Sequence, residues 1–151
     1  MKEFVIDPSS FILWSKVSFM EIIINKKLFL IILTKDVVNE LKDEKSIFYL
    51  NEGIKNGVIR IVELSDNERE DIEHVIKTKL GIGEVSCMAF CMKERKIFIT
   101  DDRKSKKRSE KMNIKAFDTI EFIKEFIKDE DLLKIIREKF KAAFPKRFEE
   151  L

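Results

Sequence analysis

Four carboxylates are the side chains of this 151-residue sequence whose types and positions best suit chemistry. Each follows a segment that predicts a strand or lies in the helix behind one, and the carboxyl ends of parallel strands meet at one edge of a sheet. Neighbouring carboxylates raise one another's pKa unless a cation neutralises them. Oxygen ligands without thiolate or imidazole favour Mg²⁺ or Mn²⁺, ions that support phosphodiester cleavage. The four residues are Asp7, Glu40, Glu84 and Asp102.

Each of these residues also has a purely structural interpretation. Asp7 fits a helix N-cap, and Glu84 fits the favourable position of an acid in the first turn of a helix. Glu40 fits a solvated helix residue, and either Asp101 or Asp102 fits the cap of the next helix. Their joint placement at strand ends, more than any single position, favours a site.

Composition excludes several other classes of chemistry. The chain has 30 basic and 28 acidic residues, so only a local patch can select a nucleic acid. One histidine excludes a His-ligated zinc cluster and disfavours a Ser-His-Asp triad. Cys87 and Cys91, four residues apart, are typical of small core residues in a cytosolic protein rather than a metal or redox pair. We expect no membrane span, no signal peptide and a cytoplasmic location.

A cluster of six cations within nine positions begins directly after Asp102. It fits either a solvated helix face or a patch that contacts the phosphates of a nucleic acid beside the site. The six residues are Arg103, Lys104, Lys106, Lys107, Arg108 and Lys111. In the second interpretation the nucleic-acid contacts are Arg103, Lys104, Lys107 and Arg108.

Apolar runs that alternate with helix signals indicate the elements that position these residues. The runs predict strands at 4–6, 28–33, 58–64, 96–100 and 114–117. Helices are expected after the caps at Asp7 and Thr34, over 46–55, after a capping box that begins at Ser65, over 84–95, over 103–112 and after Asp118. Continuous apolar strands between helices predict a parallel sheet covered on both faces. The fold class is therefore α/β, a three-layer α/β/α sandwich in one domain over 1–151.

The sequence resembles the PIN-domain family in four segments that follow the family's order from Asp7 to about Thr119. The likeness is strongest to prokaryotic PIN domains related to the ribonucleases of toxin–antitoxin pairs. The segments are Phe-Val-Ile-Asp-Pro-Ser-Ser-Phe-Ile at 4–12, Val-Val-Asn-Glu-Leu at 37–41, Gly-Ile-Gly-Glu-Val-Ser-Cys-Met-Ala at 81–89 and Ile-Thr-Asp-Asp-Arg-Lys at 99–104.

The resemblance implies a Mg²⁺- or Mn²⁺-dependent endoribonuclease with a parallel sheet of about five strands in the order 3-2-1-4-5. Its acidic tetrad maps onto Asp7, Glu40, Glu84 and Asp102, with Asp7, Glu84 and Asp102 as the metal ligands. Ser10 and Thr100 match polar positions that support the site, and Asp101 is a further supporting neighbour. The implied partners are RNA and an antitoxin protein.

Residues 119–151 extend beyond the part that the resemblance covers and are expected to form a C-terminal helical extension of the same domain. They carry twelve large apolar residues, from Ile120 to Phe148. This is more apolar surface than one sheet edge covers, and large exposed apolar patches are rare on monomers. We therefore expect a homodimer that uses part of this region, although the same residues could instead close the core within one chain.

Three alternatives compete with a freely active ribonuclease. A non-catalytic PIN-like domain would bind RNA or a protein without cleaving it. A Mg²⁺-dependent phosphate-accepting receiver domain needs a lysine at a strand end opposite the acidic cluster, and the sequence has none there. A toxin held inactive by its antitoxin would show activity only after release.

Overall fold

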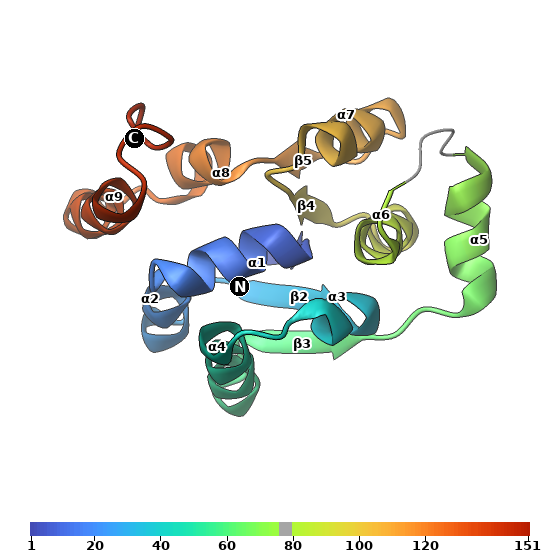
Figure 1. Cartoon of the computed structure of the whole chain (residues 1–151), viewed down its shortest axis with the longest axis horizontal. Helices are drawn as coiled ribbons and strands as arrows, with labels where there is room; N and C mark the ends of the chain where they lie inside the picture. Colours follow the sequence, from blue (N-terminus) through green and yellow to red (C-terminus); the bar gives the residue numbers. More distant parts are fainter. Residues whose placement is uncertain (76–79) are drawn as a thin grey trace.

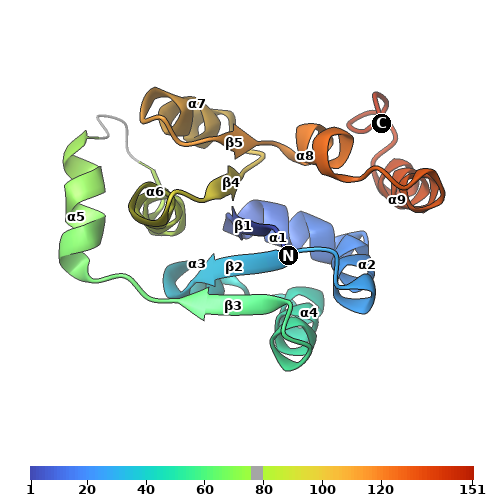
Figure 2. The same ribbon diagram turned by 180° about the vertical axis from the view of Figure 1, so that it is seen from behind.

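A five-stranded parallel sheet forms the centre of the protein, seen from opposite sides in Figures 1 and 2. The computed structural model describes residues 1–75 and 80–151. The order β3-β2-β1-β4-β5 confirms the predicted order 3-2-1-4-5 and the α/β class. The strands are β1 (Glu3–Ile6), β2 (Leu30–Thr34), β3 (Ile59–Val62), β4 (Ile97–Ile99) and β5 (Ala116–Phe117).

Helices flank the sheet, as the continuous apolar strands predict. In the described part of the chain they are α1 (Pro8–Lys16), α2 (Phe19–Lys26), α3 (Lys35–Glu40), α4 (Glu44–Lys55), α5 (Asp66–Val75), α6 (Ile82–Glu94), α7 (Arg103–Lys111), α8 (Thr119–Phe126) and α9 (Glu130–Ala143). Helix α6 packs against β1, β2 and β4, whereas α7 packs against β5 and α4 against β3. None of the helices in residues 1–75 and 80–151 has the length and hydropathy that a membrane crossing requires.

Side-chain caps set most of the helix starts. Asp7, Thr34 and Asp102 accept hydrogen bonds from backbone N–H groups at the starts of α1, α3 and α7. Asp118 and Glu121 form a complete capping box on α8, which confirms that Asp118 is a cap. Each of these caps was expected from the sequence, so the turns that follow the strands are locally encoded.

The C-terminal helices complete the core of the chain itself. Phe122 lies edge-on to Phe4, with ring centroids 4.9 Å apart, and its centroid is 5.0 Å from that of Trp14. Phe140 and Phe148 are also buried, whereas Ile135 on α9 is 47% exposed. Most of the apolar surplus is therefore internal packing, which removes the main reason to expect a dimer. The homodimer stays a prediction, as does the assignment of residues 1–151 to one domain.

Candidate active site

Asp7 is a buried carboxylate at the carboxyl end of β1. Its backbone N–H donates to the carbonyl of Ile99, which ties it to the end of β4. One carboxylate oxygen accepts from the backbone N–H of Ser10 at 2.8 Å, and the other accepts from the hydroxyl of Thr100 at 2.6 Å. Burial raises the pKa of Asp7 to about 6 although these hydrogen bonds act against the shift. Asp7 is thus both a helix cap and a charge held out of water.

The two polar residues predicted to support the site both connect β1 to the end of β4. The Thr100 hydroxyl donates to Asp7 and accepts from the backbone N–H of Asp102 at 3.2 Å. The Ser10 hydroxyl donates to a carboxylate oxygen of Asp101 at 2.7 Å and accepts from the backbone N–H of that residue at 3.0 Å. These contacts fix the direction of the Asp7 carboxylate.

Asp101 and Asp102 are adjacent in sequence but have different surroundings. The carboxylate of Asp101 accepts from Ser10 and from both the backbone N–H and the hydroxyl of Thr119, at 3.0 and 2.7 Å. It thereby joins α1 to the start of α8, and its side chain is 14% exposed. Asp102 is exposed and caps α7 through the N–H of Ser105 at 2.9 Å. Of the two, Asp102 is the carboxylate that an incoming ligand can reach.

Glu40 meets the beginning of α6 at Gly83. A Cβ atom on Gly83 would collide with the carboxylate of Glu40 and would lie 3.0 Å from Cγ of Pro8. Gly83, the chain neighbour of Glu84, therefore lies directly against the Glu40 carboxylate, and Pro8, the chain neighbour of Asp7, packs close to the same glycine. Partial burial raises the pKa of Glu40, the charge of Glu84 raises it further, and the N–H of Gly83 acts in the opposite direction. Only glycine allows the Glu40 carboxylate to come this close to the backbone of α6. The glycines of the Gly81-Ile82-Gly83 segment are the sequence feature that accompanies this approach.

The buried thiol of Cys87 on α6 is influenced by the charges of three of the four carboxylates. Cys87 on α6 is fully buried, and its Sγ lies 3.6 Å from the carbonyl oxygen of Ile6. Burial raises the pKa of Cys87, and the charges of Cys91, Asp7, Glu84 and Glu40 raise it further. Asp7, Glu40 and Glu84 therefore act electrostatically on the same part of α6.

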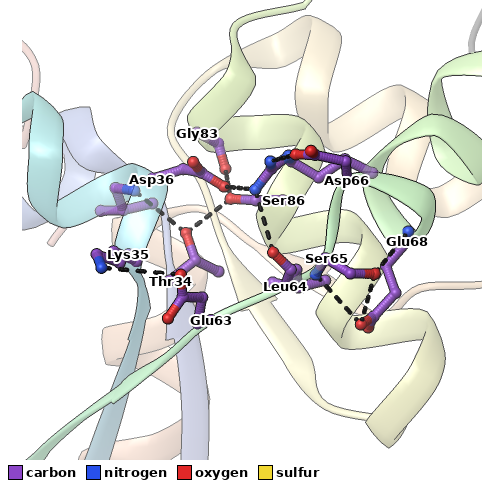
Figure 3. Close-up of polar contacts among 12 residues, drawn as sticks. Thr34, Lys35, Asp36, Glu63, Leu64, Ser65, Asp66, Glu68, Gly83 and Ser86 are labelled. Atoms are coloured by element: carbon purple, nitrogen blue, oxygen red, sulfur yellow. Dashed lines mark hydrogen bonds and ion pairs between the residues drawn. The ribbon is translucent and has the colours of Figure 1, made fainter.

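Hydrogen bonds between β2 and α6 hold this arrangement in place (Figure 3). The hydroxyls of Thr34 and Ser86 are 2.6 Å apart, and the Ser86 hydroxyl donates to the carbonyl of Gly83 at 2.8 Å. Thr34 also caps α3, the helix that carries Glu40. The position of Glu40 relative to Glu84 therefore depends on a short chain of buried hydroxyl contacts. Ser86 is a positioning residue that the sequence pattern did not single out.

An arginine from α5 also holds α3, the helix that carries Glu40. Arg69 donates to the carboxylate of Asp36 at 2.9 Å, to the carbonyl of Leu64 at 3.3 Å and to Asp66. Asp36 lies in the first turn of α3, four residues before Glu40. Because Asp36 and Arg69 are 33 residues apart, no local pattern could have indicated this contact.

The donor set fits a hard divalent cation, although the described side chains do not form a closed metal site. In residues 1–75 and 80–151, no group of three His, Cys, Asp or Glu side chains is arranged to hold one ion. The candidate ligands at this edge of the sheet are carboxylates, and Mg²⁺ and Mn²⁺ prefer such hard oxygen donors. Mg²⁺ retains several water molecules and is often held by one or two protein carboxylates, so an incomplete protein shell is compatible with it.

Helix α7 places the predicted basic patch next to these carboxylates. Arg103, Lys104 and Lys107 are exposed, and Arg108 is half-buried. Lys106 is engaged in ion pairs with Glu110 on its own helix and with Glu121 on α8. The buried side of the helix consists of Ser105 and Ser109. The cations therefore project from a helix that begins at Asp102, directly at the sheet edge.

Comparisons with known proteins agree with this architecture. The family model described as "DUF3368: PIN domain" matches residues 3–143. A PilT N-terminus domain protein from the archaeon Sulfolobus solfataricus P2 is similar in structure, with a TM-score of 0.56 and 17% identity over 85% of this chain and 96% of that one. The VapBC2 structure from Rickettsia felis, bound to a DNA fragment from its promoter, is also similar. Its TM-score is 0.53, with 14% sequence identity over 77% of this chain and 98% of that one. A comparison with curated proteins finds no match. With its family model matched over nearly the whole chain, this protein belongs to the PIN-domain family.

Proposed function

We propose that this protein is a Mg²⁺- or Mn²⁺-dependent endoribonuclease that acts in the cytoplasm. The observation that carries the proposal is the position of Gly83, the chain neighbour of Glu84, which lies against the Glu40 carboxylate and close to Pro8, the chain neighbour of Asp7. This contact gathers acidic side chains at the edge of a parallel sheet where ligands of such folds bind. Membership of the PIN-domain family supports a nuclease, and the cations of α7 suit a polyanionic substrate.

In this proposal the residues of the site have different roles. Asp7, Glu84 and Asp102 would hold the cation, and Ser10 and Thr100 orient the carboxylates around it. When bound, Mg²⁺ or Mn²⁺ supplies positive charge to phosphate oxygens and lowers the pKa of water. Glu40 is exposed and has a raised pKa, so its carboxylate suits the removal of a proton from the attacking water. The exposed cations of α7 bind the RNA backbone.

A non-catalytic RNA- or protein-binding module is the second candidate. It is favoured by one observation, the absence of a closed three-carboxylate metal site in the described part of the chain. Such a module would bind single-stranded RNA without cleaving it, and a divalent cation would not change that outcome.

We also propose that the protein is the toxin of a toxin–antitoxin pair. The basis is the structural likeness to the Rickettsia felis VapBC2 complex, which was solved on promoter DNA. An antitoxin encoded by an adjacent gene would co-purify with this chain and suppress its cleavage of RNA.

The test of the proposed activity is cleavage of single-stranded RNA by the purified full chain. We expect cleavage with Mn²⁺ or Mg²⁺ and its loss when EDTA removes the cation, because a bound divalent cation neutralises the clustered carboxylates and polarises the phosphate at the same time. Gel analysis of end-labelled RNA distinguishes internal cuts from removal of terminal nucleotides. RNA that is bound but stays intact with either cation would support the binding module instead.

The basic patch gives a separate prediction about affinity. Replacing Arg103, Lys104 and Lys107 together by Gln should weaken RNA binding and reduce the slope of log affinity against log salt by about 2, from about 0.7 per phosphate contact. The matched control replaces the exposed Lys134, Arg137 and Lys141 of α9 by Gln. Fluorescence anisotropy of labelled RNA, at several salt concentrations, measures the affinity and the salt slope of each variant. Equal affinity and equal salt slope in the two variants would mean that the patch is only a solvated helix face.

A further inference from the structure

A cavity of about 420 Å³ opens at the amino-terminal ends of β4 and β5, at the opposite edge of the sheet from the carboxylates. Its walls come from the last turn of α6 and from the turn between α7 and β5. This volume lies within the range of small-molecule sites, about 300–1,000 Å³. The residues proposed for catalysis do not line it, so it needs a separate explanation.

The charges around the cavity are all positive. Arg95, Lys96 and Lys115 line it, and no carboxylate belongs to the lining in the part of the chain that the structure describes. Lys96 is paired with Glu3 of β1, with a separation of 3.4 Å. No ion pair with a described carboxylate involves Arg95 or Lys115, and the Lys115 ammonium lies 5.8 Å from the ring centroid of Phe117. The cavity therefore attracts an anion.

Part of the lining of the cavity is apolar. Met92 and Met112 contribute flexible, polarisable side chains that adapt to a flat ring. Asn113 adds an amide that both donates and accepts hydrogen bonds. A nucleotide combines a negatively charged phosphate with a flat base. Its phosphate would pair with the cations, and its base would pack against the methionines and form hydrogen bonds with the amide.

Helix α7 connects the cavity to the proposed active site. The helix begins at Asp102 beside the carboxylates and ends next to Met112 at the cavity, a length of about 14 Å for nine residues. Lys104, Arg108 and Lys111 are spaced i, i+4 and i+7 and so share one face along this path. At the spacing of a stacked nucleic-acid strand in a duplex, about 3.4 Å per nucleotide, this distance is about four steps and needs a strand of about five nucleotides.

We infer that this cavity is a second RNA subsite, which holds a nucleotide about four positions from the phosphodiester bond that is cut, on the same strand. The inference rests on the proposed ribonuclease function. An RNA that binds tightly must therefore be long enough to reach from the bond that is cut to the cavity at the ends of α6 and α7. Arg95 and Lys115 contact the phosphate, and Met92 packs against the base.

Binding of RNA of two lengths in EDTA, where no cleavage occurs, tests the inference. Wild type should bind a single-stranded 12-mer more tightly than a 4-mer, because only the longer strand reaches both sites. Arg95→Gln with Lys115→Gln should weaken 12-mer binding about tenfold, as expected for two exposed charge contacts. Loss of two phosphate contacts should also lower the salt slope for the 12-mer by about 1.4. The 4-mer affinity should not change. Met92→Ala should weaken 12-mer binding without a change in salt slope, because it removes no charge.

The charge-matched control is Arg137→Gln with Lys141→Gln on α9, which should bind both RNAs as wild type does. The inference is overturned if the Arg95 and Lys115 variant binds the 12-mer like this control, and a site for some other anion, such as an acidic peptide, then remains. If wild type binds neither RNA, both the subsite and the proposed function fail. If wild type binds and cleaves RNA but the cavity variants have no effect, only the subsite fails.

Discussion

Replacing Asp7 by Asn should reduce RNA cleavage by at least about a hundredfold, the scale of loss when a charged ligand of a catalytic cation is removed. Asn keeps the shape of the side chain, and its carbonyl oxygen can accept the N–H of Ser10 as the carboxylate does. The substitution therefore removes the charge at the strand end while it retains the cap of α1. Single-turnover cleavage at saturating RNA and saturating Mn²⁺ measures the loss without a contribution from RNA affinity.

The chain contains a closely matched control for this substitution. Asp43 caps α4 by accepting the N–H of Ser46 at 3.0 Å, the same three-residue spacing as between Asp7 and Ser10. Asp43→Asn should therefore leave cleavage unchanged. Equal rates for Asp7→Asn and wild type would remove Asp7 from the site or identify a contaminating nuclease as the source of activity.

The sequence was sufficient to predict the sheet because most strands are short apolar runs, and β1, β2 and β5 end at or directly before the capping residues Asp7, Thr34 and Asp118. It did not predict α2, and the reason is physical. Residues 19–26 expose only Glu21, Asn25 and Lys26, so the polar face of the helix is narrow and the apolar residues around it merge with the run that forms β2. The helix also follows Ser18 in a left-handed conformation with no side-chain cap, so no capping signal marks its start.

The candidate site was predicted less completely than the fold. Asp7 could be named because it ends a predicted strand, and Ser10 and Thr100 could be named from the resemblance to PIN domains. The structure joins both residues to Asp7 by direct hydrogen bonds. The different surroundings of Asp101 and Asp102 could not be predicted, because Thr119, which engages Asp101, comes from a later helix. Contacts of this kind depend on the assembled sheet. The metal-binding role of the tetrad stays a prediction.

The buried charge of Asp7 makes stability depend on pH in a definite direction. Its pKa is about 6 in the folded chain, against an ordinary value of 3.8. The folded state therefore binds this proton more tightly than the unfolded state does. The contribution of Asp7 to stability is most favourable below about pH 3.8 and is lost as the pH rises through about 6. At 1.36 kcal/mol per pKa unit, the loss is about 3 kcal/mol.

Asp7→Asn should consequently be more stable than wild type at pH 8 without divalent cations. A gain of about 3 kcal/mol corresponds to a melting temperature higher by about 6–12 °C in a chain of this size. The difference should shrink toward zero at pH 4, where the wild-type carboxyl is protonated. Thermal unfolding followed by circular dichroism at pH 4, 6 and 8 measures it. A difference that does not vary with pH would show that ionisation of Asp7 is not its cause.

Two further measurements separate the charge of Asp7 from general effects of the substitution. Burial acts to raise the pKa of Asp43, but hydrogen bonds from Ser46 outweigh it and lower the pKa, so Asp43→Asn should not be stabilised at pH 8. Mn²⁺ should raise the melting temperature of wild type by binding only the folded state, and should have little effect on Asp7→Asn. The gap between the two proteins should therefore narrow as Mn²⁺ is added. An equal Mn²⁺ shift in both would place the cation away from Asp7, whereas a narrowing gap would mean that one buried carboxylate both destabilises the free protein and binds the cation.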